Sequence, residues 1–150
     1  MNTLFGDMAK RVKAFDPYKE AIIAAKLAED DIIAENISAL YDSGLRSDET
    51  KLGDYSEWTA ARKEADGERF DHITLRDTGK FYASMKVKFD EKSFRITADD
   101  KKVDEDGSVT YLTDEWGDEI LGLRDSVLDF IIENTIKPNM QSAFKAKILI

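Results

Sequence analysis

Few residues of this 150-residue chain could carry out catalysis or hold a metal ion. There is no cysteine, which excludes thiol catalysis, iron–sulfur clusters and cysteine-bound zinc. The single histidine, His72, stands in the polar run Phe70-Asp71-His72 with no partner at a spacing typical of a base or a metal site, so we interpret it as an ordinary loop or surface residue. No nucleophile–base pair, phosphate-binding loop or zinc-protease motif occurs. We therefore expect neither an enzymatic activity nor a cofactor.

The acidic stretch from residue 99 to 119 is the second place where chemistry is conceivable, as a cation site. Nine acidic residues there oppose only Lys101 and Lys102. A calcium-binding loop with Asp106-Gly107 at its fifth and sixth positions would need acids at Lys102 and Thr113, and both positions fail. A solvated acidic loop is the better interpretation.

The overall charge restricts the partners of the chain. Its 31 acidic and 22 basic residues give a net charge of −9, which argues against binding to nucleic acid or to an anionic membrane. The N-terminus does not resemble a signal peptide, and no apolar run approaches the roughly 20 residues that span a bilayer, so we expect a cytosolic protein or part of an assembly built there. The basic residues gather near the two ends of the chain, at Lys10, Arg11, Lys13, Lys137, Lys145 and Lys147. This asymmetry suits stacking of unlike faces between copies, although two ordinary solvated helix faces explain it equally well.

The two tryptophans are candidates for structural anchors. Trp58 belongs to a short amphipathic helix that Ser56 can cap, and we predict that it packs into the core. Trp116 stands between acidic residues, with Ile120 and Leu123 close behind it, so that core and interface roles are equally supported. Trp116, Ile120 and Leu123 are therefore candidate subunit contacts.

The helices and strands that we expect from the sequence, and that would position these residues, indicate a single α+β domain over residues 1–150. Asp16-Pro17 is typical of a helix start, and the absence of glycine and proline up to about Asp42 predicts one long helix. Residues 1–15 form either a short helix or an N-terminal arm. The polar segment 43–54 reads as a long loop, and because function concentrates in such loops, its Leu45 and Arg46 are candidate contacts.

The second half of the chain predicts a small antiparallel sheet and a closing helix. Alternating residues over about 85–98 indicate a β-hairpin, and 109–112 is a candidate third strand. A C-terminal helix begins at Asp125 or Ser126, and Pro138 should kink or interrupt it. We expect Val127 to Ile136 to pack on the chain's own core. For residues 140–150 we expect a contact with a neighbour through Met140, Phe144 and Ile148.

Two blocks of sequence resemble a known class of protein. The first block consists of Leu52-Gly53-Asp54-Tyr55-Ser56-Glu57-Trp58-Thr59, Lys63, and the run from His72 to Met85, with Leu75, Asp77, Thr78, Gly79 and Ser84 as its most telling positions. The second is the acidic-aromatic stretch from Trp116 to Leu123. This pattern, over about Tyr41 to Leu149, resembles small virion-morphogenesis proteins of tailed bacteriophages. The likeness is to the neck and tail-completion (head–tail joining) group, including versions from phages of Bacteroides-like hosts.

The resemblance implies a non-enzymatic virion protein that is made in the bacterial cytoplasm and of which several copies assemble into a ring in the neck or tail region. Its partners would be further copies of itself, the portal, and neighbouring ring or tail proteins, with no membrane and no sequence-specific nucleic acid. The residues themselves add that Asp77 can cap a short helix begun at Thr78-Gly79, whose Phe81 and Met85 would pack under the hairpin.

An alternative hypothesis is an acidic, non-enzymatic binding or inhibitor module that mimics DNA. A DNA mimic spreads its acidic residues over its surface, whereas this chain concentrates them between two basic ends. The charge pattern therefore favours the virion protein.

Overall fold

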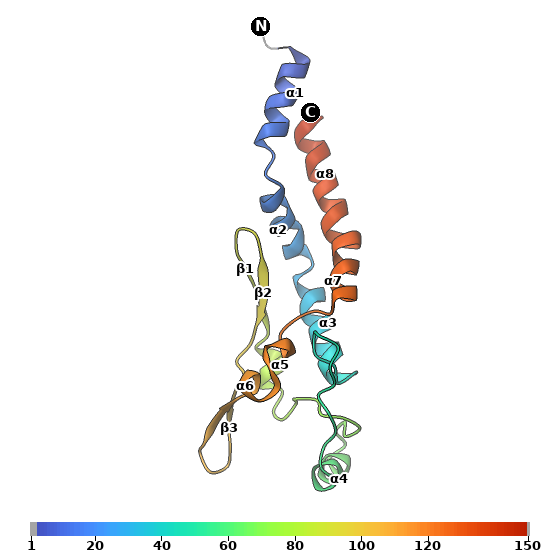
Figure 1. Ribbon diagram of the computed structural model, residues 1–150, viewed down its shortest axis with the longest axis vertical. Helices are drawn as coiled ribbons and strands as arrows, with labels where there is room; N and C mark the ends of the chain where they lie inside the picture. Colours follow the sequence, from blue (N-terminus) through green and yellow to red (C-terminus); the bar gives the residue numbers. More distant parts are fainter. Residues whose placement is uncertain (1–2, 150) are drawn as a thin grey trace.

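The structure is a computed structural model that describes residues 3–149. Figure 1 shows an elongated molecule in which the N-terminal helices follow one another along one side and the C-terminal helices run back beside them, so that the first and the last helix lie at the same tip. The outgoing helices are α1 (Leu4–Ala14), α2 (Pro17–Leu27) and α3 (Glu29–Tyr41), and the returning ones are α7 (Asp125–Ile131) and α8 (Lys137–Ile148). Among the described residues, no helix combines the length and the apolar character needed to cross a membrane.

Side chains at the expected positions cap the first two helices. Thr3 accepts a hydrogen bond from the Gly6 N–H (3.1 Å) at the start of α1. Asp16 accepts two from the first turn of α2, whose first residue is Pro17. These contacts satisfy N–H groups that have no partner within the helix. The predicted helix start at Asp16-Pro17 is confirmed, and residues 3–15 contain a short helix, while residues 1–2 of the predicted arm lie outside the described part of the chain.

The prediction of one continuous helix up to Asp42 is wrong. The chain leaves the helix at Ala28 (φ −96°, ψ 6°), and α3 begins at Glu29. Ala28 is fully buried and its N–H bonds tightly to the Ala25 carbonyl (3.0 Å), which turns the chain toward the core. The run Glu29-Asp30-Asp31 then occupies the first turn of α3, where negative charge complements the helix dipole. The acidic triplet is therefore the local sequence feature that favours the start of a second helix at Glu29.

Pro138 does interrupt the C-terminal helix, as predicted. It lies in the first turn of α8, directly after a π-helical segment from Ile132 to Ile136 that follows α7. Proline has no N–H, and in an α-helix its ring would clash with the carbonyl four residues earlier. The wider π turn makes room for the ring, so the regular α-helix is interrupted here while the chain remains helical.

The predicted hairpin is present as β1 (Lys86–Phe89) and β2 (Phe94–Thr97), paired antiparallel. Val87 lies opposite Ile96, and both side chains are buried, whereas Lys88 and Arg95 face solvent. This is the alternation expected of a strand pair with one wet face.

The predicted third strand forms but does not join this sheet. β4 (Val109–Tyr111) pairs with β3 (Lys101–Val103) in a separate two-stranded sheet. The chain turns away after β2 because the Asp99 N–H bonds to the Ser84 hydroxyl (2.8 Å) and the Asp100 carboxylate holds the Thr113 N–H (3.1 Å). The second hairpin therefore projects from the body, as Figure 1 shows for β3.

The core consists of two clusters, of which the first joins the helices to the hairpin β1–β2. The first links α3, the hairpin and α7 through Ala28, Ile32, Val87, Ile96 and Ile131. The second links α3 to the middle of the chain through Leu40, Leu52, Phe81, Met85 and Ile120. The α+β prediction, with helices from both ends packed together around small antiparallel strands, is thus confirmed.

Shorter elements complete the lower end of the molecule. They are α4 (Glu57–Ala65), α5 (Lys80–Ala83), α6 (Leu112–Trp116) and a 3₁₀ turn at Asp118–Ile120. The segment 43–54 between α3 and α4 is compact: Leu45 bridges Lys51, Leu52 is buried, and the Ser47 N–H bonds to the Glu119 carbonyl (2.9 Å). This segment is therefore packed on the chain itself.

Candidate functional site

The contact residues predicted from the sequence do not gather on one surface. Ile120 and Ile148 are buried within the chain, so neither has a surface to offer to a second subunit. Leu123 packs against the first core cluster and Trp116 against the second. Near the chain ends, half-buried Met140 and the more exposed Phe144 lie on α8, and the ring of Phe144 packs edge-on against Phe15 (5.1 Å). Leu45 and Arg46 are half-buried in the compact segment 43–54.

The positions of Ile148 and Trp58 differ from what the sequence predicted. The burial of Ile148 shows that the segment after Pro138 packs at least partly on its own chain, through α8 against α2; Ile150 lies outside the described residues. Trp58 is not a core anchor as predicted, because 71% of it is exposed. Its ring instead stacks under the Arg62 guanidinium (5.4 Å) on the outer face of α4, a contact that the spacing of four residues permits.

His72 has an ordinary structural role. Its Nε2 lies 2.8 Å from the Tyr41 carbonyl at the C-terminus of α3. The ring covers Gly44, where a Cβ atom would come within 2.7 Å of it and where φ is +62°. Arg69 donates a hydrogen bond to the neighbouring Asp42 carbonyl (2.7 Å). Polar and cationic groups at a helix C-terminus satisfy the last carbonyls, so this cluster fixes the end of α3.

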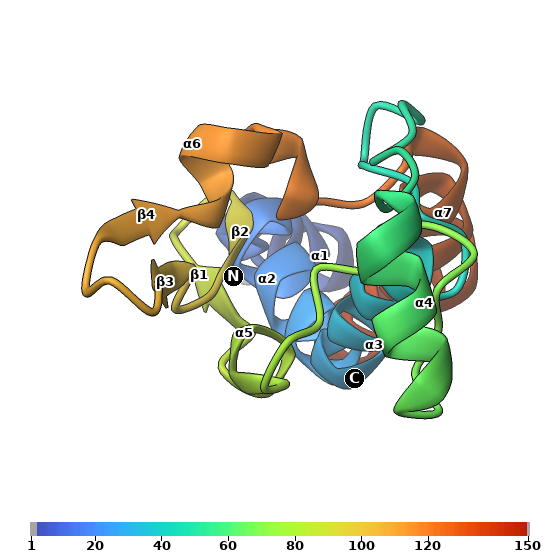
Figure 2. The ribbon, with the colours of Figure 1, turned by 90° about the horizontal axis from the view of Figure 1, so that it is seen from below.

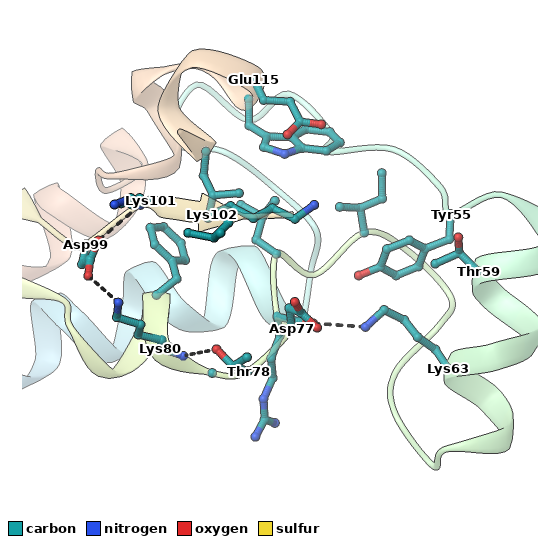
Figure 3. Close-up of a pocket in the computed structure, with 18 of the residues that line it drawn as sticks. Tyr55, Thr59, Lys63, Asp77, Thr78, Lys80, Asp99, Lys101, Lys102 and Glu115 are labelled. Atoms are coloured by element: carbon teal, nitrogen blue, oxygen red, sulfur yellow. Dashed lines mark hydrogen bonds and ion pairs between the residues drawn. The ribbon is translucent and has the colours of Figure 1, made fainter. Parts of the chain in front are cut away.

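The main concave feature is a groove of about 460 Å³ at the lower end of the molecule. Figure 3 shows it between α4, which carries Thr59 and Lys63, and the strand that carries Lys101 and Lys102, with Glu115 above. The apolar side chains that line it are Ile73, Leu75, Phe81, Val103, Leu112 and Trp116. The lining therefore combines a hydrophobic surface with charged groups around it.

The charge of this groove is opposite to that of the chain. Its basic lining residues are Arg62, Lys63, Arg76, Lys80, Lys101 and Lys102, and its acidic ones are Asp77, Asp99 and Glu115, which gives a net charge of +3. The whole chain carries −9, so the remainder carries −12. Basic residues are thus segregated into the groove, where they create a local positive field in an acidic protein.

A buried hydroxyl network holds the segment 73–82 that forms the bottom of the groove. The Thr74 N–H donates to the Tyr55 hydroxyl (3.1 Å), and the hydroxyls of Tyr55 and Thr74 lie 3.0 Å apart. The Tyr82 hydroxyl donates to the Thr74 carbonyl. Burial raises the pKa of Tyr82 well above its usual range, so Tyr82 remains a donor. Because these bonds join residues far apart in sequence, they fix this segment against the loop before α4.

The short helix α5 partly fits the expectation for the Asp-Thr-Gly segment. Phe81 and Met85 are buried as predicted, but in the second core cluster with Leu40, Leu52 and Ile120 rather than under the hairpin. The helix begins only at Lys80, however, and the Thr78 hydroxyl, rather than the Asp77 carboxylate, accepts the Lys80 N–H (3.3 Å). Gly79 precedes the helix with φ +84°, a left-handed conformation that favours glycine.

Ion pairs fix two of the groove lysines. Lys63, whose side chain is only 10% exposed, donates to Glu68 (2.7 Å) and to the Arg76 carbonyl (3.1 Å). Burial disfavours its charge, but the hydrogen bond to Glu68 and the surrounding negative groups outweigh burial and raise the pKa of Lys63. The same hydrogen bond lowers the pKa of Glu68. The structural role of Lys63 is therefore to join α4 to the segment below it.

The second ion pair links Lys80 to Asp99 (3.0 Å), and hydrogen bonding to Lys80 lowers the pKa of the Asp99 carboxyl. Arg62 and Lys101, by contrast, are exposed and form no ion pair within residues 3–149. An incoming anionic group can therefore reach both cations, of which Arg62 also stacks on Trp58 and Lys101 also lies in the field of Asp99.

The groove's residues place charged and apolar side chains next to one another. Within residues 3–149, no group of three or more His, Asp or Glu side chains is placed to hold a metal ion. Cationic and apolar side chains side by side suit a segment that carries both carboxylates and apolar residues. Comparison with protein-family models, with curated proteins and with solved structures finds no match for this chain.

Sequence reasoning missed this groove because its lining comes from segments spread between residues 55 and 116. One sequence feature does point to it. Lys101 and Lys102 are the only basic residues in the acidic stretch 99–119, and they lie on β3 at the edge of the groove.

Proposed function

We propose that this protein is a non-enzymatic structural subunit of a tailed-bacteriophage virion, which forms a ring in the neck or tail region and joins portal and tail. The observation that carries the proposal is the amount of exposed surface. The chain exposes 10101 Å². A compact monomer of 17.0 kDa is expected to expose about 7,700 Å². The excess of roughly 2,400 Å² exceeds the ~1,600 Å² that a ring subunit would bury against two neighbours at about 800 Å² each.

The exposed surface belongs to whole elements that add nothing to the chain's own core. Helix α1 has no buried residue, and 80% of Phe5 is exposed. The strands β3 and β4 are exposed at every position. Single exposed apolar residues are normal, but complete elements without buried residues are typical of arms that pack on a neighbour.

The resemblance to neck and tail-completion proteins supplies the rest of the proposal. It suggests further copies of the chain, the portal, and neighbouring ring or tail proteins as partners, and the virion as the location. The elongated shape in Figure 1, with arms at both ends, suits a subunit that contacts one layer above and another below.

The proposal is tested by mass spectrometry of gradient-purified virions from the phage that encodes the chain. We expect its peptides to co-purify with intact particles at a fixed ratio to the portal protein. A control gradient of particles from a phage in which the reading frame is deleted should show heads without attached tails. Peptides found only in the particle-free fraction, with normal particles from the deletion phage, would contradict the proposal and favour the acidic inhibitor module.

A further inference from the structure

We propose that the hairpin β3–β4 of one copy docks in the basic groove of a second copy, so that each subunit gives one contact and receives another. This inference rests on the proposed function, because it specifies how the ring subunits bind one another. Three observations support it: the hairpin has no support, the charge of its turn matches the groove, and the turn points away from the groove of its own chain.

The hairpin lacks the packing that would stabilise it. All six residues of β3 and β4 are exposed, including Val103 (60%), Val109 (46%) and Tyr111 (46%). A two-stranded hairpin is at best marginally stable in water unless another surface covers it. The hairpin β1–β2 shows the contrast, because its Val87 and Ile96 are buried in the core. A partner that covers apolar side chains is therefore needed for β3–β4.

The charges of the hairpin complement those of the groove. The connecting turn reads Asp104-Glu105-Asp106-Gly107, with three carboxylates in succession. The Asp106 carboxylate accepts the Ser108 N–H (2.9 Å) and the Gly107 N–H bonds to the Asp104 carbonyl (2.9 Å), so the turn is well formed. Lys102 pairs with Asp104 (3.3 Å), whereas the carboxylates of Glu105 and Asp106 form no ion pair within residues 3–149. These two negative charges next to exposed apolar side chains match a groove with a net charge of +3 and an apolar lining.

The hairpin cannot occupy its own groove. Lys101, Lys102 and Val103 of β3 already line one side of it, while the turn points away from the body. Figure 2 shows β3 and β4 at the side of the molecule opposite α4 and α7. The occupant is therefore the hairpin of another copy.

This contact has a geometric consequence. The turn and β4 of the hairpin lie outside the groove lining, although β3 contributes to it, so the docking surface and the groove differ and the contact is heterologous, joining copies head to tail. Such a contact produces a closed ring when the rotation between copies completes a circle. The inference thus explains how one acidic chain can associate with itself despite its net charge of −9.

The experiment exchanges charges between the two surfaces of the full-length chain. The turn variant is D104K/E105K, and the groove variant is R62E/R76E, whose two arginines line the groove but lie outside the hairpin. The matched control is D90K/E91K, which reverses the same number of charges in the exposed turn of the other hairpin. Each protein is examined by sedimentation velocity, alone and in equimolar mixtures, and circular dichroism compares its fold with that of the wild type.

We expect the turn variant and the groove variant each to lose assembly when alone, because like charges then meet, with a weakening of about 100-fold or more. The mixture of the two should assemble, since every alternating contact again joins opposite charges. A single chain that carries all four substitutions should assemble by itself, which guards against simple misfolding of either variant. The control variant should assemble like the wild type.

Normal assembly of either variant alone, or no recovery in both the mixture and the four-substitution chain, overturns the inference while leaving the proposed ring intact. A wild-type chain that stays monomeric overturns the proposed ring itself, and the inference with it. The two failures are therefore distinguishable.

Discussion

The ion pair between Glu20 and Lys147 predicts which of the two partners lowers the stability of the fold more when it is substituted. It joins α2 to α8 near the shared tip of the molecule, across 127 positions of sequence. The Glu20 side chain is only 7% exposed, whereas that of Lys147 is 54% exposed. Removing the two partners should therefore have unequal effects, because one leaves a buried charge alone and the other leaves a hydrated one.

The expected magnitudes follow from this burial. Lys147→Met keeps an apolar chain over the Phe15 ring, where the lysine now lies at 5.9 Å, but leaves the Glu20 carboxylate without its donor. An unpartnered buried polar group costs about 1–3 kcal/mol. Glu20→Gln leaves the Lys147 ammonium free to bind water and should cost about 0.5–1 kcal/mol. With roughly 2–4 °C per kcal/mol for a chain of this size, Lys147→Met lowers Tm by about 2–12 °C and Glu20→Gln by about 1–4 °C.

The assay is urea and thermal unfolding of the wild type, both single variants and the double variant, all at one protein concentration. We expect the double variant to be more stable than Lys147→Met alone, because the glutamine removes the stranded charge. An equal or larger loss from Glu20→Gln, or strictly additive losses in the double variant, would refute the argument from burial.

Three further variants test the core and the site. Ile32→Ala removes a fully buried side chain from the first core cluster and should lower the free energy of unfolding by about 2–5 kcal/mol in urea titrations, with an unchanged m-value. Glu68→Gln should be less stable than wild type at pH 7. This difference in stability should vanish as the pH falls below 4.5, the ordinary pKa of the carboxyl, and through the lowered pKa that Glu68 has in the folded protein, because protonated Glu68 no longer pairs with Lys63. At alkaline pH, the raised pKa of Lys63 keeps the pair intact up to at least pH 10.5. Tyr82→Phe should cost about 1–3 kcal/mol because the Thr74 carbonyl loses its donor, and an ultraviolet pH titration should show that the missing tyrosine was the last to ionise in the folded protein.

The elements that the sequence predicted well are those whose determinants are local. Asp16 and Pro17 start α2, Ser56 caps α4, and the alternation around Val87 and Ile96 defines a hairpin with one buried face. Each of these depends on residues within a few positions of one another, so the pattern and the structure coincide.

The features that the sequence did not reveal depend on contacts between distant segments. The break at Ala28 arises where the buried alanine meets Val87 and Ile131, which no local pattern announces. Trp58 occupies an amphipathic position, yet it is largely exposed, because no element within residues 3–149 covers that face of α4. Tertiary context decides which apolar face is covered, and the periodicity of a short helix cannot.

The candidate site was the least predictable part for the same reason. Its cations come from α4, from the segment before α5 and from β3, and only the fold brings them together. The sequence left core and interface roles open for Trp116, and in the structure it is half-buried beside both the second core cluster and the groove.

The mass of the native particle tests the central claim most directly. Native mass spectrometry of the purified full-length chain across a concentration series should show one discrete oligomer, at an integral multiple of the 17.0 kDa subunit mass, that does not grow further as the protein becomes more concentrated. A particle of 17.0 kDa at every concentration would contradict the claim that the exposed surface of this chain is covered by its own copies.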